Sequence, residues 1–293
     1  MGDLKLSDLA IFKAVVEAGG VIAAAARLHR VPSNVSARIR QLESSLGTTL
    51  FGRERKRLRL SSAGERLLPY ADRLLGLAAE ARTAISGGSP EGVLKLGALE
   101  STAASRLPAV LAEFHRAHPQ VRVELTTGTN DVLTAAVADR RLHGAFVADE
   151  PDRRALAADA VFTERLVIIS AANHVPIRSP RDVAGDSLIA FPQGCAYRRA
   201  LERWLGRSSS ASRPVLELMS YHAIVACVAS GSGIALVPES VLDTVESRGI
   251  ARHQLPAVHA VRKTFLISPL EDSLPALSAL KHGFLKKFIR SAA

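Results

Sequence analysis

The sequence contains little of what marks several classes of protein. Its 293 residues include only two cysteines, Cys195 and Cys227, which excludes a secreted domain held together by disulfides. The first residues are polar and lack the profile of a signal peptide, and no unbroken apolar run approaches the roughly 20 residues that span a bilayer. We therefore expect a cytoplasmic protein that makes no contact with a membrane.

Motifs that carry catalysis or bind metals are also absent. The sequence has no phosphate-binding glycine-rich loop, no HExxH, no CxxC and no nucleophile elbow. Its nine histidines are scattered, and although His115 and His118 are three residues apart, no third ligand is near them in sequence. We expect no enzymatic activity, no metal site and no cofactor.

Positive charge, in contrast, is abundant and unevenly placed. The formal net charge is +10, and residues 1–62 contain 11 Lys and Arg against 5 Asp and Glu, whereas the residues after 87 contain 24 against 20. A basic module beside a nearly balanced remainder is typical of a protein that binds a polyanion with one end. The sequence therefore favours double-stranded DNA as a partner.

A pattern typical of a helix-turn-helix lies within this basic segment. Pro32 suits a first helical turn, because its missing N–H would have no partner there. Apolar residues then recur at helical spacing, while the opposite face is short-chained, hydrogen-bonding and cationic, which fits a DNA major groove. Residues 21–29 predict a short alanine-rich helix just upstream. Taken alone, the pattern also fits an ordinary amphipathic helix with a solvated face. The buried stripe is predicted to consist of Val35, Ile39, Leu42 and Leu46.

The residues that follow predict a β-wing. Residues 54–60 alternate apolar and basic residues after a basic tip, and residues 61–65 carry the capping signal of a new helix. A helix-turn-helix, a wing and a helix in this order predict a winged helix-turn-helix that binds DNA. The residues expected at the DNA are Pro32, Ser33, Asn34, Ser36, Ala37, Arg38 and Arg40 from the helix and Arg53, Arg55, Lys56 and Arg57 from the wing.

The segment from Leu9 to Gly64 resembles the N-terminal signature of LysR-type transcriptional regulators. Two places depart from the family's pattern: Gly20-Val21-Ile22 replaces the common Gly-Ser-Phe-Thr, and Pro32-Ser33-Asn34 replaces Gln-Pro-Ala at the tip of the recognition helix. Within the family the chain resembles most the branch that contains regulators of putrescine utilisation, through residues 30–34, 99–104 and 194–198. The matching motifs are Ala24-Ala25-xx-Leu28, Ser36-xx-Ile39-xx-Leu42-Glu43, Leu46-Gly47-xx-Leu50-Phe51-x-Arg53 and Leu60-Ser61-xx-Gly64.

This resemblance implies a fold class and a set of partners. The implied fold is multidomain: an N-terminal all-α winged helix-turn-helix precedes an α/β sensor of two subdomains with the type-2 periplasmic-binding-protein fold. The implied partners are an interrupted palindromic operator in double-stranded DNA, a second copy of the chain in a homodimer, and RNA polymerase, with a homotetramer as the larger assembly.

We expect the chain to divide into three segments. A winged helix-turn-helix comes first, a dimerising linker helix with a hinge follows, and an effector-binding domain of two subdomains completes the chain. The expected bounds are 1–62 for the DNA-binding domain, 63–89 for the linker, and 90–293 for the effector-binding domain, with subdomain I at 90–160 and 264–293 and subdomain II at 161–263.

The linker is predicted as one long helix over Ala63–Ser86. Pro69 should kink its first turns, and Gly87-Gly88-Ser89-Pro90 should end it. An apolar stripe on a helix between two domains pairs with a second copy or packs on its own domain, and the resemblance implies the first. The stripe consists of Leu67, Ala71, Leu74, Ala78, Ala81 and Ile85.

After residue 90, short apolar runs alternate with helical patterns. Such alternation predicts parallel sheets covered by helices, and two sets of similar size predict two subdomains with a cleft between them. The expected strands are 93–99, 121–127, 144–148, 166–170, 187–191, 215–219, 234–237 and 264–268, and the expected helices are 108–118, 131–139, 197–205, 221–229 and 275–290.

Four turns after these strands carry hydroxyls, amides and backbone N–H groups. Ligands collect beyond the carboxyl ends of parallel strands, so the turns suit a small polar effector, although each single Ser or Thr also fits simple helix capping. Glu100 would serve a cationic ligand or face solvent, and Arg198 would pair with a ligand carboxylate or lie at the surface. The effector-binding residues are expected to be Glu100, Ser101, Thr102, Thr127, Gly128, Thr129, Asn130, Gly194, Cys195, Tyr197, Tyr221 and His222.

Two functions remain open at this point. The main hypothesis is a sequence-specific DNA-binding transcription regulator controlled by a small polar metabolite between two α/β subdomains. The alternative is a redox-switched regulator that uses Cys195, since a position at a helix N-terminus would lower the pKa of that thiol, whereas Cys227 resembles a small buried hydrophobe. An extracytoplasmic solute-binding protein would share the α/β fold but not the basic module.

Overall fold

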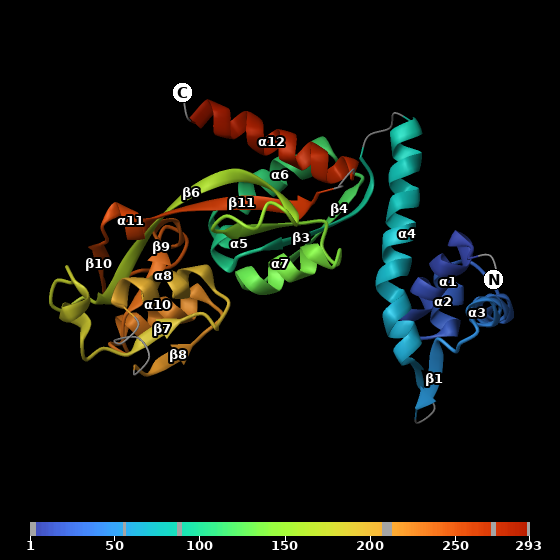
Figure 1. The fold of residues 1–293 in the computed structure, drawn as a ribbon, viewed down its shortest axis with the longest axis horizontal. Coiled ribbons are helices and arrows are strands. Elements are labelled where there is room, and N and C mark those ends of the chain that lie inside the picture. The colour runs from blue at the N-terminus through green and yellow to red at the C-terminus, as the bar shows by residue number, and fades with distance from the viewer. Residues whose placement is uncertain (1–3, 55–56, 87–89, 207–212, 271–273, 292–293) are drawn as a thin grey trace. The chain divides into compact units, whose positions relative to one another are not determined.

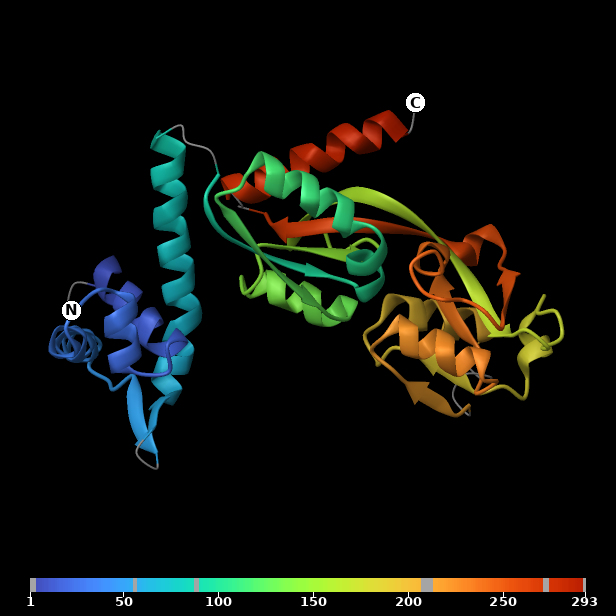
Figure 2. The ribbon, with the colours of Figure 1, turned by 180° about the vertical axis from the view of Figure 1, so that it is seen from behind.

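The computed structural model describes residues 4–54, 57–86, 90–206, 213–270 and 274–291 of the chain. The chain divides into two compact units, Met1–Gly88 and Ser89–Ala293, hereafter unit 1 and unit 2. Each is described by itself, and Figures 1 and 2 show both from opposite sides.

Unit 1 is a helical domain with a two-stranded wing. Leu9 and Phe12 are fully buried at its centre, and Val35 and Leu42 pack against them. The predicted stripe on the recognition helix holds at three positions but not at Leu46, which is 38% exposed because the helix ends there and Gly47 turns the chain with a φ of 64°. The elements are α1 (Leu6–Glu17), α2 (Val21–Arg27), α3 (Pro32–Leu46), β1 (Phe51–Glu54), β2 (Arg57–Leu60) and α4 (Ser62–Ser86).

The start of α4 is fixed by two local features. The hydroxyl of Ser61 accepts the backbone N–H of Gly64 at 3.1 Å, as the capping signal predicts. Gly64 itself is required for close packing, because a Cβ at this position would lie 2.3 Å from the carbonyl oxygen of Leu50. From there α4 continues as one helix through Pro69 to Ser86.

Unit 2 contains two lobes, which share one mixed sheet. In the first lobe, α6 and α12 cover one face of the sheet and α7 lies on the other, as both views show. The first lobe is built from β3 (Gly92–Ala98), α5 (Glu100–Ser105), α6 (Leu107–Ala117), β4 (Val121–Thr127), α7 (Asn130–Ala138), β5 (Gly144–Ala148), the first part of β6 (Leu156–Ala171), β11 (Val261–Pro269) and α12 (Pro275–Ser291).

The second lobe begins where β6 changes the strands with which it pairs. The strand pairs with β11 from Leu156 to Arg165, and from Leu166 onward it pairs with β9 and β10. The remaining elements are η1 (Pro180–Val183), β7 (Leu188–Ala190), α8 (Ala196–Leu205), β8 (Val215–Glu217), α10 (Tyr221–Ala229), β9 (Ala235–Pro238), η2 (Glu239–Val241), β10 (Ile250–Gln254) and α11 (Ala257–Ala260).

The expectation of parallel sheets is right for only part of unit 2. The strand order is β10-β6-β11-β5-β3-β4, with β9 also beside β6, and only β3 pairs in parallel with its neighbours β4 and β5. The strands β7 and β8 form a separate parallel pair, while β6 and β11 run antiparallel to their neighbours. The chain crosses between lobes on these two long strands, which removes the need for helical crossovers there.

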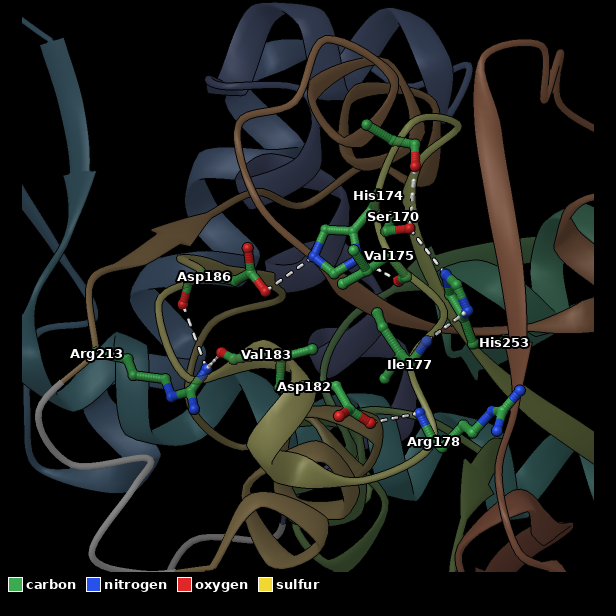
Figure 3. A network of polar contacts seen from close by, with 11 residues as sticks. Ser170, His174, Val175, Ile177, Arg178, Asp182, Val183, Asp186, Arg213 and His253 are labelled. Carbon is green, nitrogen blue, oxygen red and sulfur yellow. Dashed lines mark hydrogen bonds and ion pairs between the residues drawn. The ribbon is translucent and has the colours of Figure 1, made fainter.

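A polar network holds one edge of the second lobe together (Figure 3). The Nε2 of His174 lies 3.1 Å from Oδ2 of Asp186, and the Nδ1 of His253 on β10 accepts the N–H of Ile177 at 3.1 Å. The His253 Nε2 is 2.8 Å from the hydroxyl of Ser170. The network therefore ties the segment between β6 and β7 to β10.

None of the helices in the described parts of the chain is both long and apolar enough to cross a membrane singly. Only when taken together are the helices α1 and α2 long and apolar enough, and they are bent by 117° relative to each other. Both contribute buried residues to the core of unit 1.

Candidate functional site

The outward face of α3 is the first candidate site. Pro32, Ser33, Asn34, Ala37 and Arg40 are all exposed on it, and Ser36 is half-buried beside them. Short side chains dominate the first turns and a cation follows at Arg40, so the surface offers donors without bulk. This is the composition that the sequence predicted for a helix that reads a DNA groove.

Arg38 differs from the other predicted DNA-binding residues, because unit 1 already engages it. Its guanidinium lies 2.7 Å from the buried carboxylate of Asp8 and donates to the hydroxyl of Ser7 at 2.6 Å. The side chain therefore fastens α3 to α1 through one of its guanidinium nitrogens. Sequence reasoning missed this role because Ser7 and Asp8 are some 30 positions upstream on another helix.

Glu43 is a second structural residue on α3 that the sequence did not reveal. Its Oε1 accepts the backbone N–H of Leu50 at 2.8 Å and that of Phe51 at 3.3 Å. One carboxylate thereby fixes the start of β1 relative to the recognition helix. The wing residues Arg55 and Lys56, and the side chains of Arg53 and Arg57, lie outside the described residues.

The predicted dimerisation stripe on α4 divides into a buried and an exposed part. Ala71 is fully buried in the core of unit 1 and Leu67 packs beside it, so Ala71 is unavailable to a second copy. Among the α4 side chains that the structure describes, the large exposed apolar ones are Tyr70 at 58%, Leu74 at 37% and Leu77 at 60%. Ala78 is half-buried, Ala81 is exposed, and the side chain of Ile85 lies outside the described residues.

The second candidate site lies between the lobes of unit 2, where α5 faces α8 and α10. Ser101, Tyr197 and Tyr221 are each no more than 3% exposed. The Ser101 hydroxyl lies close enough to both tyrosines to oppose the rise in their pKa, which burial raises well above the usual value. Residues nearly 100 positions apart therefore meet at one place, as the sequence predicted.

Several buried polar atoms in this region make no hydrogen bond of good geometry within the described structure, although the Ser101 hydroxyl lies near both tyrosines. They include Oε2 of Glu100, Oγ of Ser101, Oγ1 of Thr102 and the hydroxyl of Tyr197. A buried polar atom without a partner is destabilising, and such atoms are uncommon in proteins. We shall call these four groups the orphan cluster; Tyr221 lies beside them but is not one of the unpartnered groups.

Glu100 is the charged member of the orphan cluster. Burial raises the pKa of its carboxyl group, which the backbone N–H of Tyr221 and the charge of the exposed His222 lower in part. The carboxylate thus extends from the first lobe to the first residue of α10 in the second. A small pocket lined in part by Phe191, Tyr197 and Tyr221 adjoins it in the second lobe.

Other predicted effector-binding residues have structural roles. The Asn130 side chain accepts the N–H of Ala148 at 3.0 Å and donates to its carbonyl, which pins the end of β5. Thr129 packs against Gly194 of the second lobe, where φ is +88° and a Cβ would lie 3.1 Å from the Thr129 hydroxyl. Thr127 is exposed at the end of β4, and Gly128 donates to the carbonyl of Ala98 at 3.2 Å.

For Arg198 the sequence left open a ligand-binding role and a surface position, and the structure excludes the second, because the side chain is buried and lines the small pocket beside Tyr221. Arg198 is 8% exposed, and its guanidinium donates to Glu202 at 2.9 Å, to Glu217 at 2.5 Å and to the carbonyl of Phe191 at 3.2 Å. The guanidinium therefore already binds two carboxylates and one backbone carbonyl of the second lobe.

Cys195 lies in the candidate site, but its thiol is poorly suited to oxidation. Burial raises its pKa, which outweighs the lowering by the backbone N–H groups of Arg198 and Tyr197 at the start of α8. The predicted lowering is therefore wrong in direction, because the helix terminus is less important than the 6% exposure of the residue. Neither Cys195 nor Cys227 forms a disulfide.

An ion-pair network behind the orphan cluster was not predicted. Arg106 donates to both oxygens of buried Glu164 on β6, at 2.6 and 3.0 Å. Ser240 of the second lobe donates to Glu164 at 2.8 Å, and Ser105 of α5 lies 3.2 Å from Ser240. No local pattern marks these residues, since they come from three separate parts of the chain.

The fold and the two sites define a class of protein: a helix-turn-helix DNA-binding domain followed by a two-lobed ligand-binding domain. Residues 6–65 match the family model of the bacterial regulatory helix-turn-helix protein, lysR family, and residues 87–288 match that of the LysR substrate binding domain. The chain belongs to the LysR family. This is a family of transcription regulators rather than of enzymes, with a DNA-binding helix-turn-helix and an effector-binding domain.

Individual relatives support the assignment along the full length. The chain is 38% identical to the uncharacterized HTH-type transcriptional regulator YusT of Bacillus subtilis (strain 168), over 90% of this chain and 89% of that one. It is 33% identical to the HTH-type transcriptional regulator GltR of the same strain, over 94% of each chain.

Two solved structures share the fold. A full-length OxyR variant from Pseudomonas aeruginosa has a TM-score of 0.73 at 19% identity, covering 97% of this chain and 95% of that one. Full-length CbnR complexed with its target DNA has a TM-score of 0.67 at 23% identity, covering 97% and 99%.

Proposed function

We propose that this protein controls transcription in response to a small polar metabolite bound between the two lobes of unit 2. Residues 1–62 would bind the operator, residues 63–89 would join two copies, and residues 90–293 would bind the effector. The observation that carries the proposal is the orphan cluster, whose buried donors and acceptors gain partners when a polar ligand enters.

The interactions around the cluster suggest how the signal would leave it. Ser101 of the cluster and Ser105 of the Arg106–Glu164–Ser240 network lie on the same six-residue helix, α5, where the Ser105 hydroxyl donates to the Ser101 carbonyl at 2.7 Å. A ligand that moves α5 would therefore act on the interactions with the second lobe. By linkage, an effector that prefers one placement of the lobes shifts the population toward it.

On the DNA side, the proposal assigns base recognition to Ser33, Asn34 and Ser36 and phosphate binding to Arg40 and the wing. Two copies would bind the two halves of an interrupted palindrome, with the exposed apolar residues of α4 between them. These assignments are supported by the exposed face of α3 and by membership in the family.

Ser101→Ala tests the proposal. Polar metabolites would be screened by thermal unfolding of the full-length protein, since a ligand that binds the folded state raises its apparent stability. We expect at least one metabolite to bind, and Ser101→Ala to weaken it by about 0.5–1.5 kcal/mol for a neutral hydrogen bond. Ser232→Ala, an exposed serine of the second lobe, is the matched control. Binding that is insensitive to Ser101, or a response abolished only by Cys195→Ser, would favour another site or the redox hypothesis.

A further inference from the structure

Around the orphan cluster the positive charges are paired with carboxylates, whereas the negative charge of Glu100 is not paired with an arginine. The arginines nearest the cluster already have carboxylate partners: Arg106 with Glu164, Arg198 with Glu202 and Glu217, Arg199 with Asp131 at 3.0 Å, and Arg203 with Asp149 at 4.0 Å. An anionic ligand would therefore have to share a guanidinium that already neutralises a carboxylate.

The carboxylate of Glu100, in contrast, is not paired with any of these arginines. Its Oε2 is buried and has no hydrogen-bond partner in the described structure. The groups that face it from the other elements are the N–H of Tyr221 and the side chain of His222, which is exposed. The nearest buried side chains with unused capacity are hydroxyls, which accept hydrogen bonds as readily as they donate them.

From this arrangement we infer that the effector is a small organic cation, an alkylammonium or alkylguanidinium, whose N–H groups donate to Glu100 and to the hydroxyls of the orphan cluster. The inference rests on the proposed function and specifies its ligand class. An ammonium carries three donors and no acceptor, so it satisfies a carboxylate and two hydroxyls at once.

The surroundings indicate the direction in which the apolar part of such a ligand would extend, although the pocket has room for only about one water molecule and would have to widen to admit a hydrocarbon chain. The pocket beside the cluster is lined by Ile189, Phe191, Tyr221 and Ile224 among others, and Phe191 and Tyr221 pack with their ring centroids 4.9 Å apart. Aromatic faces attract cations and accept hydrocarbon. Tyr221 contributes its N–H to the Glu100 side and its ring to the pocket, so both parts of the ligand would meet at this residue.

The test uses the full-length protein and probes that share one hydrocarbon stem and differ in charge. These are butyl and hexyl ammonium and guanidinium salts, the corresponding alcohols, and the corresponding carboxylates, measured by titration calorimetry. We expect the cationic probes alone to bind. Glu100→Gln should weaken that binding by about ten- to a hundredfold, because a charged hydrogen bond becomes a neutral one. The matched control is Glu246→Gln, whose side chain is 72% exposed in the second lobe.

A second measurement does not depend on how the Glu100 variant folds. In the wild-type protein the affinity for butylammonium should fall as the pH falls through the raised pKa of Glu100, because the protonated carboxyl loses its charge. The trend should persist in His222→Gln, which removes the other titrating group that faces the carboxylate.

The outcomes separate the two proposals. Ser101-dependent binding of the alcohols or carboxylates but not of the cations would overturn the cationic class and leave the effector site in place. Cation binding that is unchanged in Glu100→Gln would overturn the inference as well. Should none of the cationic probes bind, the inference fails. If, in addition, the metabolite screen yields nothing sensitive to Ser101→Ala, the proposed function fails with it.

Discussion

Arg38 of the recognition helix and the buried Asp8 of α1 form an ion pair with 2.7 Å between nitrogen and oxygen. Asp8 is 4% exposed, so its carboxylate relies on Arg38 for charge compensation. The pair fixes the orientation of α3 on the domain that carries it.

We predict that Arg38→Met destabilises the packing of α3 on α1 by about 1–3 kcal/mol, because it leaves a buried carboxylate without its cation. Hydrogen exchange of the α1 and α3 amides in the full-length protein would report the change. Adding Asp8→Asn should recover part of the stability, as a double-mutant cycle would show. Unchanged protection together with weaker DNA binding would instead make Arg38 a DNA-binding residue.

The exposed face of α3 yields a prediction that separates two kinds of DNA recognition. Arg40→Ala should weaken binding to all sequences and flatten its salt dependence by about one unit of log–log slope for each phosphate that is no longer neutralised. Asn34→Ala should relax preference at one base position by roughly 1–3 kcal/mol per half-site. Binding titrations over a range of salt would measure both effects. Arg122→Ala, whose side chain is 76% exposed on β4 of unit 2, should leave both unchanged.

Self-association should depend on the exposed apolar residues of α4, among them Leu77, which lies outside the predicted stripe, rather than on the buried Ala71. Leu77 is 60% exposed, and Leu77→Asp would place a charge where a second copy is proposed to pack. Sedimentation should then show self-association weakened by about tenfold or more. Val258→Asp, at a 75% exposed position of unit 2, serves as the control. If Leu77→Asp assembles like the wild-type protein, the proposed interface is elsewhere.

The polar network of Figure 3 predicts a stability maximum near the ordinary pKa of histidine. The Val175 carbonyl and Asp186 raise the pKa of His174, so its contribution is present below about pH 6.5 and is lost as the pH rises through the raised pKa. Burial and the charge of His174 lower the pKa of His253, so its contribution is present above about pH 6.5 and is lost as the pH falls through the lowered pKa.

Thermal unfolding measured on both sides of this maximum would show stability declining toward acid and toward alkaline pH. His174→Gln should remove the decline on the alkaline side, whereas His115→Gln, an exposed histidine on α6, should leave the profile unchanged. A profile that is flat in the wild-type protein would mean that this network does not contribute to stability.

Sequence patterns predicted the structure correctly where it depends on residues that are close together in the chain. The recognition helix begins at Pro32 as predicted, and the wing and the capped start of α4 follow in the predicted order. The strands β4 and β5 have the predicted bounds, because apolar alternation and flanking turns define them locally.

Prediction was weakest where partners are distant in the chain. Only the end of β6 was expected as a strand, because its first half, with Asp159 and Glu164, lacks the apolar run of a buried strand. Its pairing with β11 involves residues about 100 positions away, and β10 is a polar edge strand with a weak pattern of its own. The same limit applies at the site: nothing local shows that Asn130 and Arg198 are engaged, or that one oxygen of Glu100 is not.

A strand that belongs to both lobes constrains how they can move. Every stretch of β6 is held by neighbours, β11 before Leu166 and β9 with β10 after it, so the strand cannot fold like a flexible loop without breaking ladder hydrogen bonds. Paired strands occur over a range of twists about their own axes. The two lobes are therefore coupled through a strand whose twist can vary. We expect the binding of a ligand at α5 to rotate one lobe against the other rather than to open the lobes about a hinge.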